Sequence, residues 1–340
     1  MIQKMKYFLL LHAKIKVILN KPYMLPIFNE KIQIITDSGK KVEAQAPVII
    51  SAGRSTDIPA FYSEWFINRL KVGYCVWYNP FNRQPMYISF KNTKTVVFWS
   101  KNPRPLIPYL KELDDRGIHY YFQFTLNDYE QEGFEPNVPP LTERIKTFKD
   151  LSEQIGKEKV IWRFDPLIVA PQLTPRDLLK KIWNVGKQLK GYTNKLVFSF
   201  VDIKAYRKVQ SNMVKETSFF EKNNIKKAEL NDAQILETVE GLVKIRERWK
   251  SEGYDIALAT CAEKPDLEQY GIEHNRCIDG EGMKKDKGQR KFCGCKVSKD
   301  IGMYNTCRHH CVYCYANTSK EAVKNAMLSF DVNSESIISR

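Results

Sequence analysis

The chain has 340 residues, 43% of them hydrophobic and 27% charged, a balance typical of a globular protein with one large domain or two smaller ones. Its formal net charge of +15 favours an anionic partner such as nucleic acid, although a basic solubilising surface would give the same excess. No stretch reaches the roughly 18 apolar residues of a membrane span. We therefore expect a cytoplasmic protein without a membrane partner, and we interpret residues 1–28 as a basic N-terminal extension.

Short apolar strands alternate with amphipathic helices over residues 29–262. We predict strands at 47–51, 95–99, 119–125, 159–164, 195–201 and 255–260. Helices are expected to begin near Pro59, Pro105, an N-cap at Thr142, an N-cap at Thr174 and Asn231. Strands that are apolar on both faces are typical of a parallel sheet covered by helices. Repeated strand–helix units without a G-x-G-x-x-G turn favour an α/β fold built as a partial or full (β/α) barrel.

Two further elements are predicted outside this repeating pattern. A hairpin is expected over residues 31–44 around the turn at 37–39, and a strand over 74–78 is inserted after the first helix. Cys75 lies in that apolar strand, and we interpret it as a small buried hydrophobic residue.

Polar residues stand where the predicted strands end, which is where the active-site residues of α/β barrels lie. This set comprises Arg54, Asp57, Lys101, Asn102, Gln123, Thr125, Arg163, Asp165, Ser199, Asp202, Thr260, Cys261 and Glu263. Each could instead be a structural salt bridge or a helix cap, and Asp57 is the clearest cap candidate. The candidate catalytic residues are Arg163, Asp165 and Lys101, and the candidate cofactor-binding residues are Tyr313, Gln123 and Ser199.

Seven of the eight cysteines follow residue 260, a clustering that indicates metal binding rather than a disulfide framework. Cys307, Cys311 and Cys314 have the spacing C-x3-C-x2-C, so three thiolates can bind three irons of a [4Fe-4S] cluster and leave the fourth iron open. Zinc is commonly held by paired C-x2-C steps, and this segment has one such step, so a cluster is favoured there.

The remaining four cysteines, Cys261, Cys277, Cys293 and Cys295, can saturate either a second cluster or one zinc ion, and both interpretations remain open. His309 and His310 are interpreted as lying outside the set of ligands. An open iron can bind the amino and carboxylate groups of S-adenosylmethionine. An electron from the reduced cluster then breaks a carbon–sulfur bond and produces a 5′-deoxyadenosyl radical, which removes hydrogen from a substrate. Arg163, Lys101 or Arg54 could hold the cofactor carboxylate or an anionic substrate.

The run Cys307, Cys311, Tyr313, Cys314, Tyr315 resembles the signature of the radical S-adenosylmethionine superfamily, although it stands near the C-terminus instead of the N-terminus. The stretch 47–319 also resembles a bacterial family described as domain of unknown function 1848. The motifs that carry this resemblance lie at 55–62, 97–103, 120–125, 161–166, 260–263 and 300–307. The resemblance implies that residues 263–340 form a cysteine-rich iron–sulfur segment, which packs on a barrel core of residues 29–262.

Three functions are compatible with these features. The favoured one is a radical S-adenosylmethionine-type enzyme, which acts on an unknown anionic or nucleic-acid substrate and receives electrons from a reductant such as ferredoxin or flavodoxin. The second is a nucleic-acid-binding protein that zinc or iron–sulfur clusters stabilise without catalysis, for which steep salt dependence of binding is expected. The third is an electron-transfer protein, for which so many strand–helix units would be an excessive scaffold.

Overall fold

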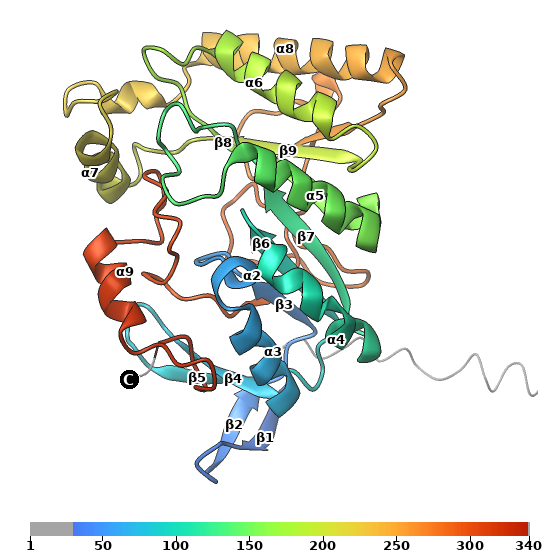
Figure 1. Cartoon of the computed structure of the whole chain (residues 1–340), viewed down its shortest axis with the longest axis vertical. Coiled ribbons are helices and arrows are strands. Elements are labelled where there is room, and N and C mark those ends of the chain that lie inside the picture. Colours follow the sequence, from blue (N-terminus) through green and yellow to red (C-terminus); the bar gives the residue numbers. More distant parts are fainter. Residues whose placement is uncertain (1–29, 339–340) are drawn as a thin grey trace, which may run out of the picture.

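A sheet of eight parallel strands runs through the middle of the protein in the computed structural model, which describes residues 30–338 (Figure 1). The order across the sheet is β11-β10-β9-β8-β7-β6-β3-β12. The strands are β3 (Ile49–Ala52), β6 (Thr95–Ser100), β7 (His119–Thr125), β8 (Val160–Leu167), β9 (Lys195–Phe200), β10 (Ala257–Thr260), β11 (Ile272–His274) and β12 (Lys299–Asp300). From β3 to β11, strands that follow one another along this list are neighbours in the sheet, with crossovers between them.

The mixed α/β fold predicted from the sequence is confirmed. All six predicted parallel strands are present within a few residues of their expected bounds. The edge strands β11 and β12 do not pair with each other, so no closed barrel forms among residues 30–338, and the prediction of a full barrel is not met. Both edge strands come from the segment after residue 262, so this segment extends the sheet at both ends. Neither strand is predicted from the sequence, because each has only two or three residues.

The helices connect successive strands and cover the sheet (Figure 1). They are α2 (Ile58–Phe61), α3 (Ser63–Val72), α4 (Leu110–Asp115), α5 (Leu141–Ile155), α6 (Pro175–Gln188), α7 (Arg207–Glu216), α8 (Asp232–Ser251) and α9 (Lys320–Met327). The N-cap predicted at Thr174 is confirmed, and its side chain accepts a hydrogen bond from the backbone of Asp177. Thr142 is not an N-cap, because α5 begins one residue earlier, after Pro140. Pro140 has no side-chain oxygen with which to cap a helix.

Side chains alternate between the two faces of the sheet. On one face, Phe98, Phe124 and Trp162 are fully buried in the core that the helices cover. On the other, Val97 belongs to a smaller cluster formed with Cys277 and neighbouring residues of the C-terminal segment. This alternation follows from the two-residue period of a strand. It directs the odd-numbered polar residues of β6, β7 and β8 toward the cysteines.

A second, four-stranded sheet has the order β1-β2-β5-β4 and lies at the lower end of the molecule in Figure 1. Its strands are β1 (Lys31–Ile35), β2 (Lys41–Gln45), β4 (Tyr74–Tyr78) and β5 (Pro85–Ser89). The predicted hairpin and the inserted strand are therefore confirmed, and Cys75 is fully buried, as expected. The predicted extension 1–28 lies outside the described residues. No helix between residues 30 and 338 is both long and apolar enough to cross a membrane.

Candidate functional site

A cavity of about 660 Å³ opens at the carboxyl ends of the parallel strands. The last residues of β6, β7, β8 and β9 and the loops after β3, β6, β9 and β10 form its wall together with the C-terminal segment. All seven cysteines that follow residue 260 line this cavity, namely Cys261, Cys277, Cys293, Cys295, Cys307, Cys311 and Cys314. All seven are free thiols. The fold therefore brings residues that lie far apart in the sequence to one place.

The loop that carries Cys307, Cys311 and Cys314 is held in place by hydrogen bonds to its backbone, one from the junction of α2 and α3 and one from within the C-terminal segment. The Tyr62 hydroxyl donates to the carbonyl of the residue before Cys307 at 2.5 Å, and Asn317 Nδ2 donates to the Cys307 carbonyl at 2.7 Å. Cys311 is buried, and Cys307 and Cys314 are partly buried. Burial raises the pKa of Cys307 to about 12. Without a positive partner that binds the sulfur, these thiols stay protonated at neutral pH.

The other four cysteines form a second group in the same cavity. The sulfur atoms of Cys261 and Cys277 lie 3.5 Å apart, and a hydrogen bond from the Cys295 thiol lowers the pKa of Cys293 to about 7. Cys277 Sγ also accepts hydrogen bonds from Arg163 Nη1 and from Asn275 Nδ2, each at 3.1 Å. N–H donors aimed at a sulfur atom stabilise its thiolate form, which is the form that binds metals.

The sulfur atoms of the seven cysteines fit iron–sulfur chemistry, but they do not surround one common point as the ligands of a single metal ion would. Within residues 30–338, no group of three or more His, Cys, Asp or Glu side chains is arranged to hold a metal ion. A [4Fe-4S] cluster binds each thiolate on a different iron, so its ligands stand further apart than the ligands of one ion. Cys307, Cys311 and Cys314 would hold such a cluster. The ligand prediction for all seven cysteines stays a prediction.

The buried Arg163 and the partly buried Asp165 form an ion pair on the cavity wall, with 2.6 Å between Arg163 Nη2 and Asp165 Oδ2. Burial alone would raise the pKa of Asp165, but the Arg163 guanidinium and the hydrogen bond from Ser199 together outweigh burial, and the pKa is lowered. The Ser199 hydroxyl donates to the other oxygen of the same carboxylate. Gln123 does not line the cavity. It lies beneath, where its Oε1 accepts from Arg163 Nη1 at 3.0 Å and its Nε2 donates to the Cys277 carbonyl at 2.9 Å.

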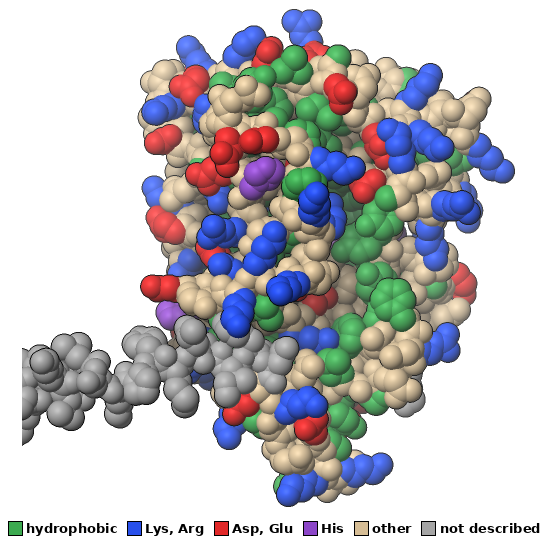
Figure 2. Space-filling model, turned by 180° about the vertical axis from the view of Figure 1, so that it is seen from behind, with side chains coloured by type: hydrophobic (Ala, Val, Ile, Leu, Met, Phe, Trp, Pro, Cys, Tyr) green, Lys and Arg blue, Asp and Glu red, His purple; other side chains and the backbone are tan. Residues whose placement is uncertain are grey.

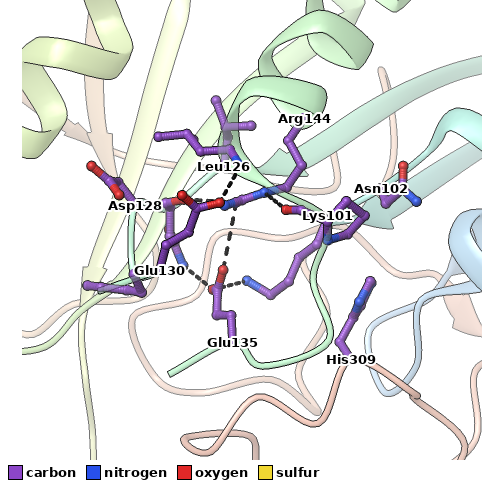
Figure 3. Close-up of polar contacts among 12 residues, drawn as sticks. Lys101, Asn102, Leu126, Asp128, Glu130, Glu135, Arg144 and His309 are labelled. Atoms are coloured by element: carbon purple, nitrogen blue, oxygen red, sulfur yellow. Dashed lines mark hydrogen bonds and ion pairs between the residues drawn. The ribbon is translucent and has the colours of Figure 1, made fainter. Parts of the chain in front are cut away.

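Lys101 belongs to a second buried network, which Figure 3 shows around Glu135. Lys101 Nζ lies 2.7 Å from Glu135 Oε1 and 2.9 Å from the Tyr313 hydroxyl, which itself donates to Glu135. Arg144 Nη1 approaches Glu135 Oε2 at 3.7 Å. Burial would raise the pKa of Glu135, but Lys101 and Arg144 lower it to about 2. This network fixes Tyr313 between the second and third cysteines of the motif.

His309 stands between the first two cysteines of the motif in the sequence, and both of its ring nitrogens contact oxygen atoms of other residues. Its Nε2 lies 2.8 Å from Asp57 Oδ2, and both side chains are buried. Asp57 also accepts a hydrogen bond from the backbone of Ala60 at 2.9 Å, so its predicted role as a helix cap is confirmed. The contact ties the cysteine loop to the start of α2.

Most of the predicted site residues meet at the cavity. Its lining includes Lys101, Thr125, Arg163, Asp165, Ser199, Asp202, Cys261, Arg54, Asp57 and Tyr313, whereas Asn102, Gln123, Thr260 and Glu263 are not part of it. The lining also contains Trp99, Tyr206 and Arg290, which the sequence analysis did not select. The end of β6 could have indicated Trp99, since it stands two residues before Lys101. No local pattern marks Glu135, which lies in an irregular loop.

Comparisons with curated proteins and with solved structures find no match for this chain. A comparison with protein-family models matches residues 49–316 to the family described as Domain of unknown function (DUF1848). The matched range contains all seven cysteines of the cavity and every candidate site residue named above. It covers well over half of the chain, and the protein therefore belongs to the DUF1848 family.

Proposed function

We propose that this protein is a radical S-adenosylmethionine-type enzyme that binds a [4Fe-4S] cluster through Cys307, Cys311 and Cys314. The observation that carries the proposal is that these three thiols line a cavity at the carboxyl ends of parallel strands. Six successive parallel strands are neighbours in chain order, from β3 to β10, which is the arrangement expected of a partial barrel like that of the radical enzymes. The cavity of about 660 Å³ lies within the size range typical of sites for small molecules.

A reduced cluster would supply the electron that cleaves bound S-adenosylmethionine and so starts hydrogen abstraction. The residues of this chain shape the place where that happens. Lys101 and Arg163 are held by Glu135 and Asp165, so we assign them to positioning: Lys101 orients Tyr313, and Arg163 orients Cys277. Ser199 fixes the second oxygen of Asp165, and Gln123 supports Arg163 from below.

The four-cysteine group is proposed as a second metal centre with no open position. Four thiolates saturate either a second cluster or one zinc ion, and the two differ in metal content. After reconstitution, two clusters would give about eight irons per chain, and one cluster with zinc would give about four. An external reductant such as ferredoxin or flavodoxin would supply electrons, and a cytoplasmic location would suit both centres.

The test is anaerobic iron–sulfur reconstitution, followed by electron paramagnetic resonance of the reduced protein with and without S-adenosylmethionine. We expect a cubane signal that changes on addition of the cofactor and release of 5′-deoxyadenosine. The signal should be lost or altered in Cys311→Ala and kept in Cys75→Ala, a matched control because Cys75 is buried and is not part of the cavity lining.

Tightly bound zinc without any cluster signal would overturn the proposal. That result would favour the alternative of a metal-stabilised nucleic-acid-binding protein. The face in Figure 2 shows Lys and Arg side chains over much of its area, with Asp and Glu side chains among them. A basic surface of this kind is compatible with either function. We rank the enzyme above the alternative because the three thiols of the motif line one cavity.

A further inference from the structure

Three exposed tyrosines stand together on the rim of the cavity. Tyr206, Tyr304 and Tyr315 all line it, with 40%, 39% and 48% of their surfaces exposed. The rings of Tyr206 and Tyr315 are stacked, with centroids 5.8 Å apart and an angle of 28° between their planes. Tyr304 meets Tyr315 edge-on at 6.3 Å. Large aromatic side chains grouped in the open around a cavity are typical of a binding surface.

These rings border the proposed cluster. Tyr315 directly follows Cys314, and Tyr304 stands three residues before Cys307. Tyr206 comes from another part of the chain, the loop between β9 and α7. The three rings therefore form one platform, which two distant segments build next to the triad of cysteines. A ligand stacked on this platform would lie beside the reacting end of the cavity.

The cationic side chains of the cavity fall into two kinds. Lys101 and Arg163 are paired with carboxylates, as described above. Arg54 and Arg290 also line the cavity, and neither forms an ion pair within the described part of the chain. Of the carboxylates that line the cavity, Asp202 likewise has no partner among the described residues. Among the charged side chains that line the cavity, two arginines and one aspartate are thus left without an ion-pair partner. These unpaired groups give the cavity a surplus of positive charge, which an anionic ligand could neutralise.

Arg54 is the better placed of the two unpaired arginines. Its Nη2 is buried and has no hydrogen-bond partner among the described residues, and its guanidinium lies 5.7 Å from the centre of the Trp99 ring. Leaving a buried donor without an acceptor costs about 1–3 kcal/mol, and more for a charged group. An anionic ligand would supply the missing acceptor, and arginine suits phosphate because its N–H groups match two phosphate oxygens.

We propose that the rim binds a nucleotide, free or within a single strand of nucleic acid. Its base would stack on the platform of Tyr206, Tyr304 and Tyr315, and its phosphate would pair with Arg54 and Arg290. The nucleotide is the substrate of the enzyme, and this last statement alone rests on the proposed function. Aromatic stacking accepts any base, so the platform accounts for the chemical class of the ligand but not for the identity of the base.

Equilibrium binding by the full chain tests this proposal without S-adenosylmethionine present. The probe is a fluorescein-labelled ten-residue oligothymidylate, and the competitors are thymidine 5′-monophosphate, thymidine and ribose 5-phosphate. We expect the monophosphate to compete at least tenfold better than thymidine, which lacks the phosphate, or ribose 5-phosphate, which lacks the base. If the oligothymidylate binds much more tightly than the monophosphate, the ligand is a nucleotide within a strand. If the two bind with equal affinity per site, the ligand is the free nucleotide. Equal competition by ribose 5-phosphate, or no binding of any probe, would overturn the proposal.

Two variants and two controls locate the binding. Tyr315→Leu should weaken it roughly 5- to 100-fold, the usual effect of losing one stacked ring. Arg54→Gln should weaken it as well and lower the slope of log affinity against log salt for the strand by about 0.7. Phe81→Leu, at a side chain that is 93% exposed, and Arg176→Gln, at an exposed site on α6, should change neither. Equal effects in the controls would refute the assignment.

The two proposals can fail separately. If the cluster forms and responds to S-adenosylmethionine but nucleotides do not bind, the assignment of the substrate is wrong and the enzyme proposal stands. If nucleotides bind in a Tyr315-dependent way but no cluster forms, the rim is a nucleotide site and the enzyme proposal is wrong.

Discussion

Replacing Glu135 by Gln should destabilise the protein strongly at neutral pH. The carboxylate is buried between two cations, with Lys101 Nζ at 2.7 Å and Arg144 Nη1 at 3.7 Å (Figure 3). Glutamine keeps the shape of the side chain but removes the negative charge. The buried Arg144 and the partly buried Lys101 would then face a neutral amide, and removing one partner of a buried ion pair leaves the other charge uncompensated.

The magnitude follows from the pKa of Glu135, which falls from its ordinary value of 4.5 to about 2 in the folded protein. This difference corresponds to a contribution of about 3 kcal/mol to the free energy of unfolding. Because the folded-state pKa is the lower one, the contribution is fully present above pH 4.5. It is lost as the pH falls from about 4.5 toward 2.

Urea unfolding followed by circular dichroism measures the effect. At pH 7, Glu135→Gln should lose about 3 kcal/mol relative to the wild type. Near pH 2 the two proteins should differ little, because Glu135 of the wild type is then about half protonated in the folded state and nearly fully protonated in the unfolded chain. Glu237→Gln is the matched control, since Glu237 is exposed in the middle of α8, and it should stay within about 0.5 kcal/mol of the wild type. A loss below about 1 kcal/mol at pH 7 would refute the electrostatic reasoning.

Three further substitutions test local packing, each by the urea midpoint. Gly53→Ala should cost at least about 2 kcal/mol, because Gly53 has φ +115° and a Cβ there would lie 2.6 Å from a backbone oxygen. An unchanged midpoint would contradict this. Gly186→Ala should destabilise α6, because the added Cβ would lie 2.2 Å from the Trp249 ring, and this clash outweighs the preference of alanine for helices. A gain in stability would show that the ring can move. Thr174→Ala should cost about 1 kcal/mol through the lost cap of α6, and no loss would mean that Asp177 caps the helix without it.

Local patterns were sufficient for the elements of the fold. The strands at 95–100 and 119–125 and the cap at Thr174 depend on the hydrophobic period and on hydrogen bonds within a few residues, so the sequence near them determines them. The same holds for the cysteine spacing at 307–314, which brings three thiols into one short loop. Short edge strands and the exact start of α5 were missed, because neighbouring chain segments decide where such elements begin and end.

The pairing of charges was decided by the tertiary structure. From the sequence, Lys101 and Arg163 were expected to bind a ligand, but the fold pairs each with a carboxylate, the buried Glu135 and the partly buried Asp165. Glu135 comes from a loop 34 residues away and has no sequence signal of its own. Arg54 was one of several cations in the sequence, and the fold gives it no ion pair with any residue between 30 and 338.

The sequence by itself determined the α/β pattern and the seven cysteines, because periodicity and spacing are local properties of the chain. The tertiary structure alone decided that the four cysteines and the triad share one cavity. It also decided that three tyrosines from two distant segments meet on its rim. The physical reason is that both results require contacts between residues far apart in the chain. Such contacts form only when the strand ends and the C-terminal segment pack together, and no local preference encodes them.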